Sequence, residues 1–272
     1  MARRRHGFTV GQVALLGVLL VLAGVAWLVT NARMGAMAPM PAMELGGLGF
    51  YLTVWVVMMA AMMFPSVAPT VLMYDRLRER NRERGKGAEP DATALFVAGY
   101  LCVWTAAGVG AYGLFDLVRS FDLAFLAWDE SGRYVTGAVI VAAAVYQMTP
   151  LKQACLIKCR SPMMFLAVHW RHGRTGAVEL GVRHGAWCLG CCWALMAALF
   201  AVGVMSLGWM ALIAALIAAE KLLPWPAAAR TTVAVLLLAL GLAVVFAPAA
   251  VPGFIEPVNG TGGHGPGMQM TR

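Results

Sequence analysis

The chain has 272 residues and a formal net charge of +8, and 61% of its residues are hydrophobic while only 12% are charged. This apolar share is far above that of a soluble domain, and it comes in long uncharged runs of the roughly 20 residues that cross a bilayer as a helix. Nucleic-acid binding is disfavoured despite the positive charge, because the chain has neither a Gly-rich phosphate loop nor a basic patch with interleaved aromatic residues.

The apolar runs predict an all-α, polytopic membrane helix bundle. Seven spans are expected, at residues 9–30, 48–73, 92–117, 134–148, 186–203, 207–222 and 231–247. The uncharged run over 186–219 is too long for one span, so we divide it at the sequence GVMSLG. The chain is thereby organised into a first helix and outer loop (1–47), a helix bundle (48–250) and a flexible outer tail (251–272).

The distribution of Lys and Arg between the two sides predicts the orientation of the bundle. With the N-terminus in the cytoplasm, the inner segments hold 17 of these residues and the outer segments hold 4. The positive-inside rule then favours a multi-pass protein with its N-terminus in the cytoplasm and its C-terminus outside. The basic start of the chain also fits a cleaved signal peptide, but the first apolar segment has the length of an uncleaved helix.

Methionines mark the outer loop after the first span, which reads NARMGAMAPMPAM. Met34, Met37, Met40 and Met43 recur at every third residue, and the interspersed prolines argue against a helical packing stripe. Thioethers are uncharged soft donors that suit Cu(I), so we expect copper ligands here. The tail repeats the theme with His264, Met268 and Met270.

The second span contains the sequence MMAAMM, whose methionines form two pairs one helical turn apart. The pairs are Met58 with Met62 and Met59 with Met63. They are candidate copper ligands, although Met is also an ordinary filler of hydrophobic cores. Pro65 and Pro69 follow at once, so a kink in this span is expected.

The loop before the fifth span, residues 149–183, is predicted to carry two short helices at the inner membrane surface. In TPLKQACLIKCRSP, Thr149 is the expected N-cap, Pro150 occupies the first helical position, and the helix should stop at Ser161. A second helix should run from Ser161 to Gly173. Its histidines, His169 and His172, are explained by a basic surface helix as well as by a ligand role.

Cysteines form the strongest candidate site. Cys155 and Cys159 are spaced i, i+4 on the first short helix, and Cys188, Cys191 and Cys192 are spaced i, i+3, i+4 near the inner end of the fifth span. Both sets are expected at the same membrane depth, with His184 one turn before Cys188 on the same stripe. Cytosolic thiols stay reduced, and clustered thiolates suit Cu(I), with Zn(II) as the alternative metal. A lone buried Cys is usually a small hydrophobe, and that is our interpretation of Cys102.

Thioethers outside and in mid-membrane with thiolates inside would form a gradient of increasing affinity for Cu(I). This suggests a soft-metal protein that hands Cu(I) across the membrane. Its expected partners are the lipid bilayer, the ion and a metallochaperone or metalloenzyme, and its Ala/Gly-rich helices permit a homo-oligomer. The spans contain no central Asp or Glu for proton coupling, and no nucleotide-binding loop occurs, so an active pump is disfavoured. No catalytic residue is expected.

Two other interpretations remain. The first is a thiol–disulfide relay, since Cys188 and Cys191 form a CxxC pair, and only this interpretation would make the protein an oxidoreductase. The second is a metal-dependent assembly factor or sensor, in which a bound ion holds two helices together.

Three stretches resemble a bacterial family of integral membrane proteins described as metal-binding and built on a domain of unknown function. They are YLTVWVVMMAAMMFPSVAP, YQMTPLKQACLIKCRSP and CLGCCWALMAALFAVGVMSLGWMALIAALIAAEKL, and with the helices between them they cover residues 50–222. The resemblance implies an inner-membrane protein with a metal-binding role. The outer methionines lie beyond the matched stretches.

Overall fold

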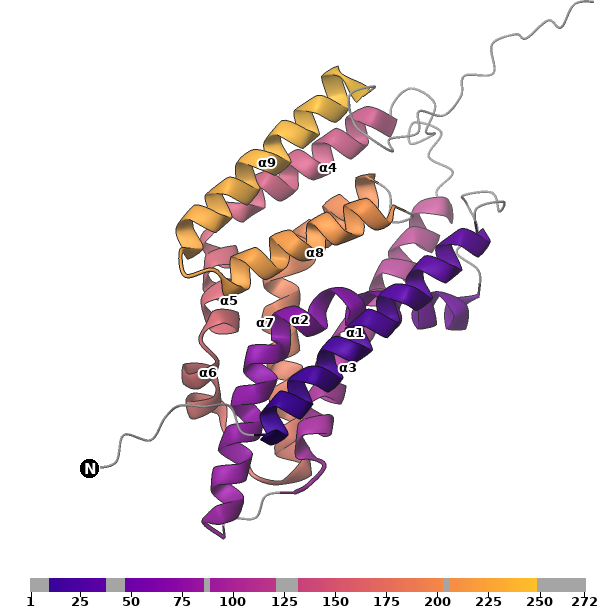
Figure 1. Cartoon of the computed structure of the whole chain (residues 1–272). Helices are drawn as coiled ribbons and strands as arrows, with labels where there is room; N and C mark the ends of the chain where they lie inside the picture. Colours follow the sequence, from indigo (N-terminus) through magenta and orange to yellow (C-terminus); the bar gives the residue numbers. More distant parts are fainter. Residues whose placement is uncertain (1–9, 38–46, 86–88, 121–131, 203–205, 249–272) are drawn as a thin grey trace, which may run out of the picture.

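The computed structural model describes residues 10–37, 47–85, 89–120, 132–202 and 206–248, and these residues form helices without any strand. The all-α prediction is therefore confirmed (Figure 1). The helices are α1 (Val10–Met37), α2 (Leu48–Glu83), α3 (Ala92–Ser120), α4 (Gly132–Gln147), α5 (Pro150–Arg160), α6 (Pro162–His169), α7 (Gly173–Val202), α8 (Leu207–Leu222) and α9 (Pro226–Phe246).

Five of the described helices are long and apolar enough to cross a membrane: α1, α2, α3, α7 and α9. The consecutive helices α4 and α5 pass the same test only as a pair bent by 66°, which raises the total to as many as six. Helix α8 has 16 residues, about 24 Å of helix, which is short for a 30 Å hydrocarbon core. The predicted total of seven spans is therefore not confirmed.

Helix α7 begins at Gly173, thirteen residues before the predicted start of the fifth span. Gly173 has φ +81° and lies in the left-handed region, where glycine is favoured. The second short helix, α6, ends earlier than predicted, at His169. The polar first third of α7 stays helical because it packs closely on α3, where a Cβ added to Gly181 would lie 2.0 Å from the carbonyl oxygen of Phe96.

The end of α1 and the length of α2 also differ from the sequence-based expectations. Helix α1 continues through Met37, so Met34 and Met37 lie in its last turn rather than in a loop. The helix ends just before the first proline of the segment, where the residue preceding proline is biased away from helical geometry. Helix α2 passes through Pro65 and Pro69 as one element of 36 residues, and it bends along its length (Figure 1).

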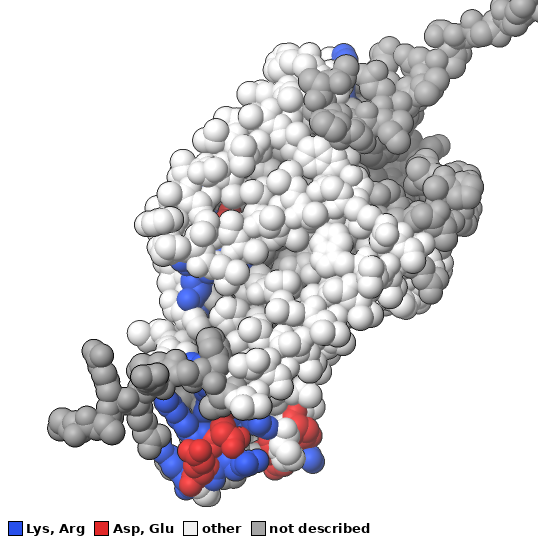
Figure 2. Space-filling model, viewed as in Figure 1, with Lys and Arg blue, Asp and Glu red and all other residues white. Residues whose placement is uncertain are grey.

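Charged side chains gather at one end of the molecule, formed by the end of α2 and the starts of α3 and α7 (Figure 2). Ion pairs join these segments, including one of 3.0 Å between Arg174 and Asp91. Most of the remaining visible face is uncharged, as expected for helices that contact lipid. This separation is compatible with membrane insertion.

Candidate metal centre

Three thiols converge on one face of α7. Cys188, Cys191 and Cys192 are all buried, and their Sγ atoms lie within 4.8 Å of one another. The Cys191 and Cys192 sulfurs are 3.3 Å apart. Cys191 also donates a hydrogen bond of 3.1 Å to the carbonyl oxygen of Cys188, which orients its side chain toward the group. The cluster lies in the middle of α7, about 22 Å from its first residue, rather than near the helix end that we predicted.

A fourth thiol reaches this cluster from α5. The Sγ atoms of Cys159 and Cys191 are 3.7 Å apart. Helix α5 has the predicted limits, because the Thr149 side chain accepts from the Lys152 amide and Pro150 occupies the first turn, while Ser161 caps the other end. Sulfurs from the two helices therefore meet at Cys159, one of the two cysteines on α5.

Cys155 is buried on the same helix but lies beside the cluster. A Cβ added to Gly190 would lie 2.8 Å from the Cys155 sulfur, so this thiol packs directly on the α7 backbone. The Tyr146 hydroxyl donates a 2.6 Å hydrogen bond to the Gly190 carbonyl at the same place. Gly190 thus allows α4 and α5 to approach α7 closely, and Cys155 forms part of that contact.

Two polar side chains contact the sulfur of Cys188. The Lys221 ammonium donates to it over 3.0 Å from α8, and the Tyr100 hydroxyl of α3 lies 3.1 Å away. Lys221 also donates to Ser66 on α2 over 3.3 Å. A positive charge at this position offsets the cost of a thiolate in an apolar interior. Sequence reasoning missed these contacts because Lys221 looked like an ordinary charge at the end of a span.

The geometry fits a soft metal ion. With metal–thiolate bonds of about 2.3 Å, two sulfurs that share one ion stand roughly 3.8–4.6 Å apart, depending on the number of ligands. The distances from Cys191 to Cys159 and Cys192, 3.7 and 3.3 Å, fall short of this range by about 0.1 and 0.5 Å at its lower end and by about 1 Å at its upper end, which side-chain rotation can supply. Cys159, Cys188, Cys191 and Cys192 can therefore offer two to four sulfurs without a change in the fold.

His184 and the α2 methionines pack among aromatic or apolar side chains. His184 is buried one turn before Cys188, but its ring packs among Phe96, Tyr100 and Phe165, and it does not join the three mutually close thiols. The α2 methionines lie in the hydrophobic core; these are Met58, Met59, Met62 and Met63. Of the outer ligands, Met40, Met43, His264, Met268 and Met270 fall outside the described residues.

Cys102 is exposed on α3, which corrects the expectation that it belongs to the core. Its helix presents this face outward, whereas the aromatic residues Phe96, Tyr100 and Trp104 of the same helix are buried. A single apolar helix does not reveal from its sequence which face meets its neighbours. Cys102 is consequently a useful control thiol, because it is exposed and does not belong to the described thiol cluster.

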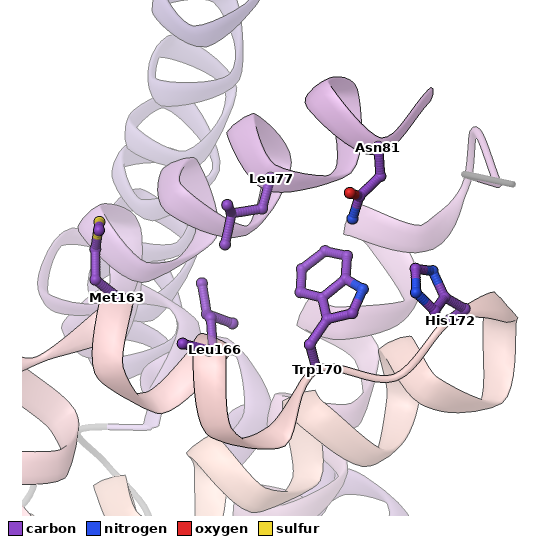
Figure 3. Close-up of a pocket in the computed structure, with 7 residues that line it drawn as sticks. Leu77, Asn81, Met163, Leu166, Trp170 and His172 are labelled. Carbon is purple, nitrogen blue, oxygen red and sulfur yellow. The ribbon is translucent and has the colours of Figure 1, made fainter. Parts of the chain in front are cut away.

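A separate cavity of about 260 Å³ lies between α2 and the segment around α6. Figure 3 shows Leu77 and Asn81 of α2 facing Met163, Leu166, Trp170 and His172. Met163 and His172 lie at opposite ends of it, so these two soft-metal donors do not converge. The His169 Nδ1 atom lies 3.0 Å from the backbone carbonyl of Phe165, within α6 itself. The thiol cluster is therefore the stronger candidate for metal binding.

A protein-family model described as PpoB2, copper chaperone, matches residues 52–244. This range contains the whole thiol cluster, Lys221 and the α2 methionines, while the segment that carries Met34 to Met43 lies outside it. No curated protein and no solved structure matches the chain.

Proposed function

Because this chain belongs to the PpoB2 copper chaperone family, we propose that it is a membrane-embedded carrier of Cu(I) whose cargo is held by the thiol cluster. Cys188, Cys191 and Cys192 form the core of the proposed site, and Cys159 adds a fourth sulfur. The observation that carries this proposal is the convergence of thiols from two helices, with 3.7 Å between Cys159 and Cys191.

The chemistry of the cluster supports Cu(I) as cargo. Thiolates are the ligands that best select a soft monovalent ion, and each thiol gives up its proton when it binds the metal. The Lys221 ammonium would stabilise the resulting negative charge on the Cys188 sulfur, which lies 3.0 Å away. Exchange of one thiolate for a ligand of a partner protein would then release the ion without any covalent turnover of the protein.

The proposed direction of transfer uses the methionines as weaker sites. Thioethers near the outer side and along α2 would receive Cu(I), and the thiolates of α5 and α7 would bind it more tightly. This direction of transfer requires a bacterial inner-membrane protein whose N-terminus lies in the cytoplasm. The 17-to-4 distribution of Lys and Arg supports that orientation. A metallochaperone or metalloenzyme on the cytoplasmic side would be the acceptor.

The test is copper retention by the detergent-purified protein under reducing conditions. The wild type should retain about one equivalent of Cu(I) against a competing chelator, as measured by elemental analysis. The Cys188→Ser, Cys191→Ser, Cys192→Ser triple variant should retain none, whereas Cys102→Ser should behave as wild type. Retention of zinc in place of copper would support the same site with the alternative metal. Absence of both metals from the wild type would exclude the proposal.

A thiol–disulfide relay is the second candidate, because Cys159 and Cys191 are close enough to form a disulfide after a small movement. Two thiols would lose two protons and pass two electrons to an acceptor. Rapid acid trapping of cells followed by mass spectrometry distinguishes the candidates. A population lighter by about 2 Da, the mass of the two lost hydrogens, and dependent on Cys159 would favour the relay.

A further inference from the structure

A buried ion pair joins α5 to α8 beside the thiol cluster. The Lys152 ammonium donates to Glu220 Oε2 over 2.7 Å, and the two side chains are only 1% and 2% exposed. Lysine and glutamate are almost never fully buried unless they are paired. The ion pair therefore connects α5 to α8 at a specific pair of buried atoms.

The other end of α5 is tied to the same place. The Arg160 guanidinium donates to the backbone carbonyls of Glu220 and Leu223 at the end of α8. Lys152 and Arg160 are eight residues apart, about two helical turns. Cys159 lies between these two ties, and it follows Lys152 at i+7 on one helical face. The contacts of Lys152 and Arg160 with α8 thus fix the position of the α5 face that carries the Cys159 thiol.

One turn of α8 contacts both helices that carry the clustered thiols. Glu220 reaches Lys152 of α5, and its neighbour Lys221 reaches Cys188 of α7. The position of α5 relative to α7 therefore depends on α8 as a common support.

The buried charges of Lys152 and Glu220 are not explained by stability alone. Glu220 Oε1 and the Gln147 amide are buried and lie close enough to interact, but they do not form a hydrogen bond of good geometry. Moving two charges out of water costs several kcal/mol per ion, and an apolar pair of similar size is often at least as stabilising. A charged pair differs from an apolar one in that it specifies which atoms meet, so it fixes the register of α5 on α8.

We infer that the Lys152–Glu220 ion pair, together with Arg160, positions Cys159 against Cys191 and so decides whether three or four sulfurs face a bound ion. The part of this inference that concerns copper rests on the proposed function. The positioning of Cys159 does not, and it can be tested without metal.

The first experiment measures disulfide formation in the detergent-purified, metal-free protein. The reporter keeps Cys159 and Cys191, with Cys102, Cys155, Cys188 and Cys192 replaced by Ser, and diamide serves as the two-electron oxidant. Glu220→Gln should slow formation of this disulfide about tenfold or more, because Cys159 loses its effective concentration near Cys191. A second reporter keeps only Cys188 and Cys191 of α7, and its rate should not change. Loss of the first reaction alone identifies positioning, because general unfolding would alter both.

Matched variants guard against a trivial result. Glu179→Gln removes from α7 a half-buried carboxylate that pairs with Arg171 and Arg183, and it should leave both rates unchanged. The charge swap Lys152→Glu with Glu220→Lys restores an ion pair, and it should recover the Cys159–Cys191 reaction. If Glu220→Gln fails to fold, the swap variant decides alone: a wild-type rate supports the inference. Unchanged crosslinking in Glu220→Gln, or a folded swap variant that does not crosslink, would overturn it.

The second experiment measures Cu(I) affinity by chelator competition. Glu220→Gln should lower the affinity about tenfold, as much as Cys159→Ser does, and the double variant should show no further loss. Additive losses would contradict the inference even if copper binding is established. If the wild type binds no copper, the proposed function fails, while the disulfide result still decides the positioning role.

Discussion

The α2 methionines and the α7 cysteines are two sulfur-rich regions with the same kind of spacing but different surroundings. Met58 and Met62, like Cys188 and Cys192, are four residues apart, and all four side chains are buried in one core. The cysteines meet a sulfur from α5, an ammonium from α8 and a hydroxyl from α3. The four methionines Met58, Met59, Met62 and Met63 pack among the apolar side chains of that core. Helical spacing alone therefore does not distinguish a binding site from packing.

Charge explains this difference. A thioether is neutral, so burying it costs nothing that a neighbouring cation could offset. A thiolate in an apolar interior is costly, and it needs a metal ion, an ammonium or a hydrogen-bond donor nearby. The position of Lys221 against Cys188 is thus the feature that sets the cysteine region apart.

The largest difference between the two regions should appear on removal of a sulfur. Cys191→Ser should lower Cu(I) affinity by more than about 100-fold, since loss of one of the three core thiols should exceed both the loss of the fourth sulfur, Cys159, and the roughly 10–100-fold effect of an outer-shell change. Met59→Leu conserves volume and should leave the affinity within about threefold and cost less than about 1.5 kcal/mol of stability. Chelator competition and thermal unfolding in detergent measure these effects. Equal losses of copper in the two variants would mean that thioethers and thiolates contribute alike.

An intermediate effect is expected for Lys221→Met, which removes the ammonium beside Cys188. The affinity for Cu(I) should fall about tenfold or more, because the charge of the metal–thiolate group loses its compensating cation. Lys158→Met is the matched control, since the Lys158 ammonium lies over the Trp187 ring at 4.1 Å. The same chelator assay decides the outcome, and tighter copper binding by Lys221→Met would contradict the assigned role.

The smallest effect should follow from Tyr100→Phe, which deletes the hydroxyl 3.1 Å from the Cys188 sulfur and keeps the aromatic ring. One hydrogen bond to sulfur contributes about 1 kcal/mol, so the affinity for Cu(I) should change only a few-fold. Titration with the chelator at several protein concentrations can resolve a change of this size. A loss as large as that of Cys191→Ser would show that Tyr100 takes a more direct part in metal binding.

Local signals predicted the structure best where a helix boundary depends on its own residues. The limits of α5 follow from Thr149, Pro150 and Ser161, which supply a cap, a fixed φ and a stop. The start of α7 was missed because it depends on packing against α3, in which Gly181 lets the two backbones approach. Likewise, Cys102 was assigned to the core although it is exposed, because a uniformly apolar sequence does not show which face of the helix packs against its neighbours.

The amino-acid order by itself determined the all-α class, the apolar helices and the two helical faces that carry thiols, because hydrophobicity and i, i+4 spacing act within one segment. Only the tertiary structure decided which sulfurs meet. It placed Cys159 on the α7 cluster, left Cys155 against Gly190, and brought Lys221 from a distant helix to Cys188. The physical reason is that contacts between helices depend on close backbone approach and on buried charge pairs, which no single segment encodes.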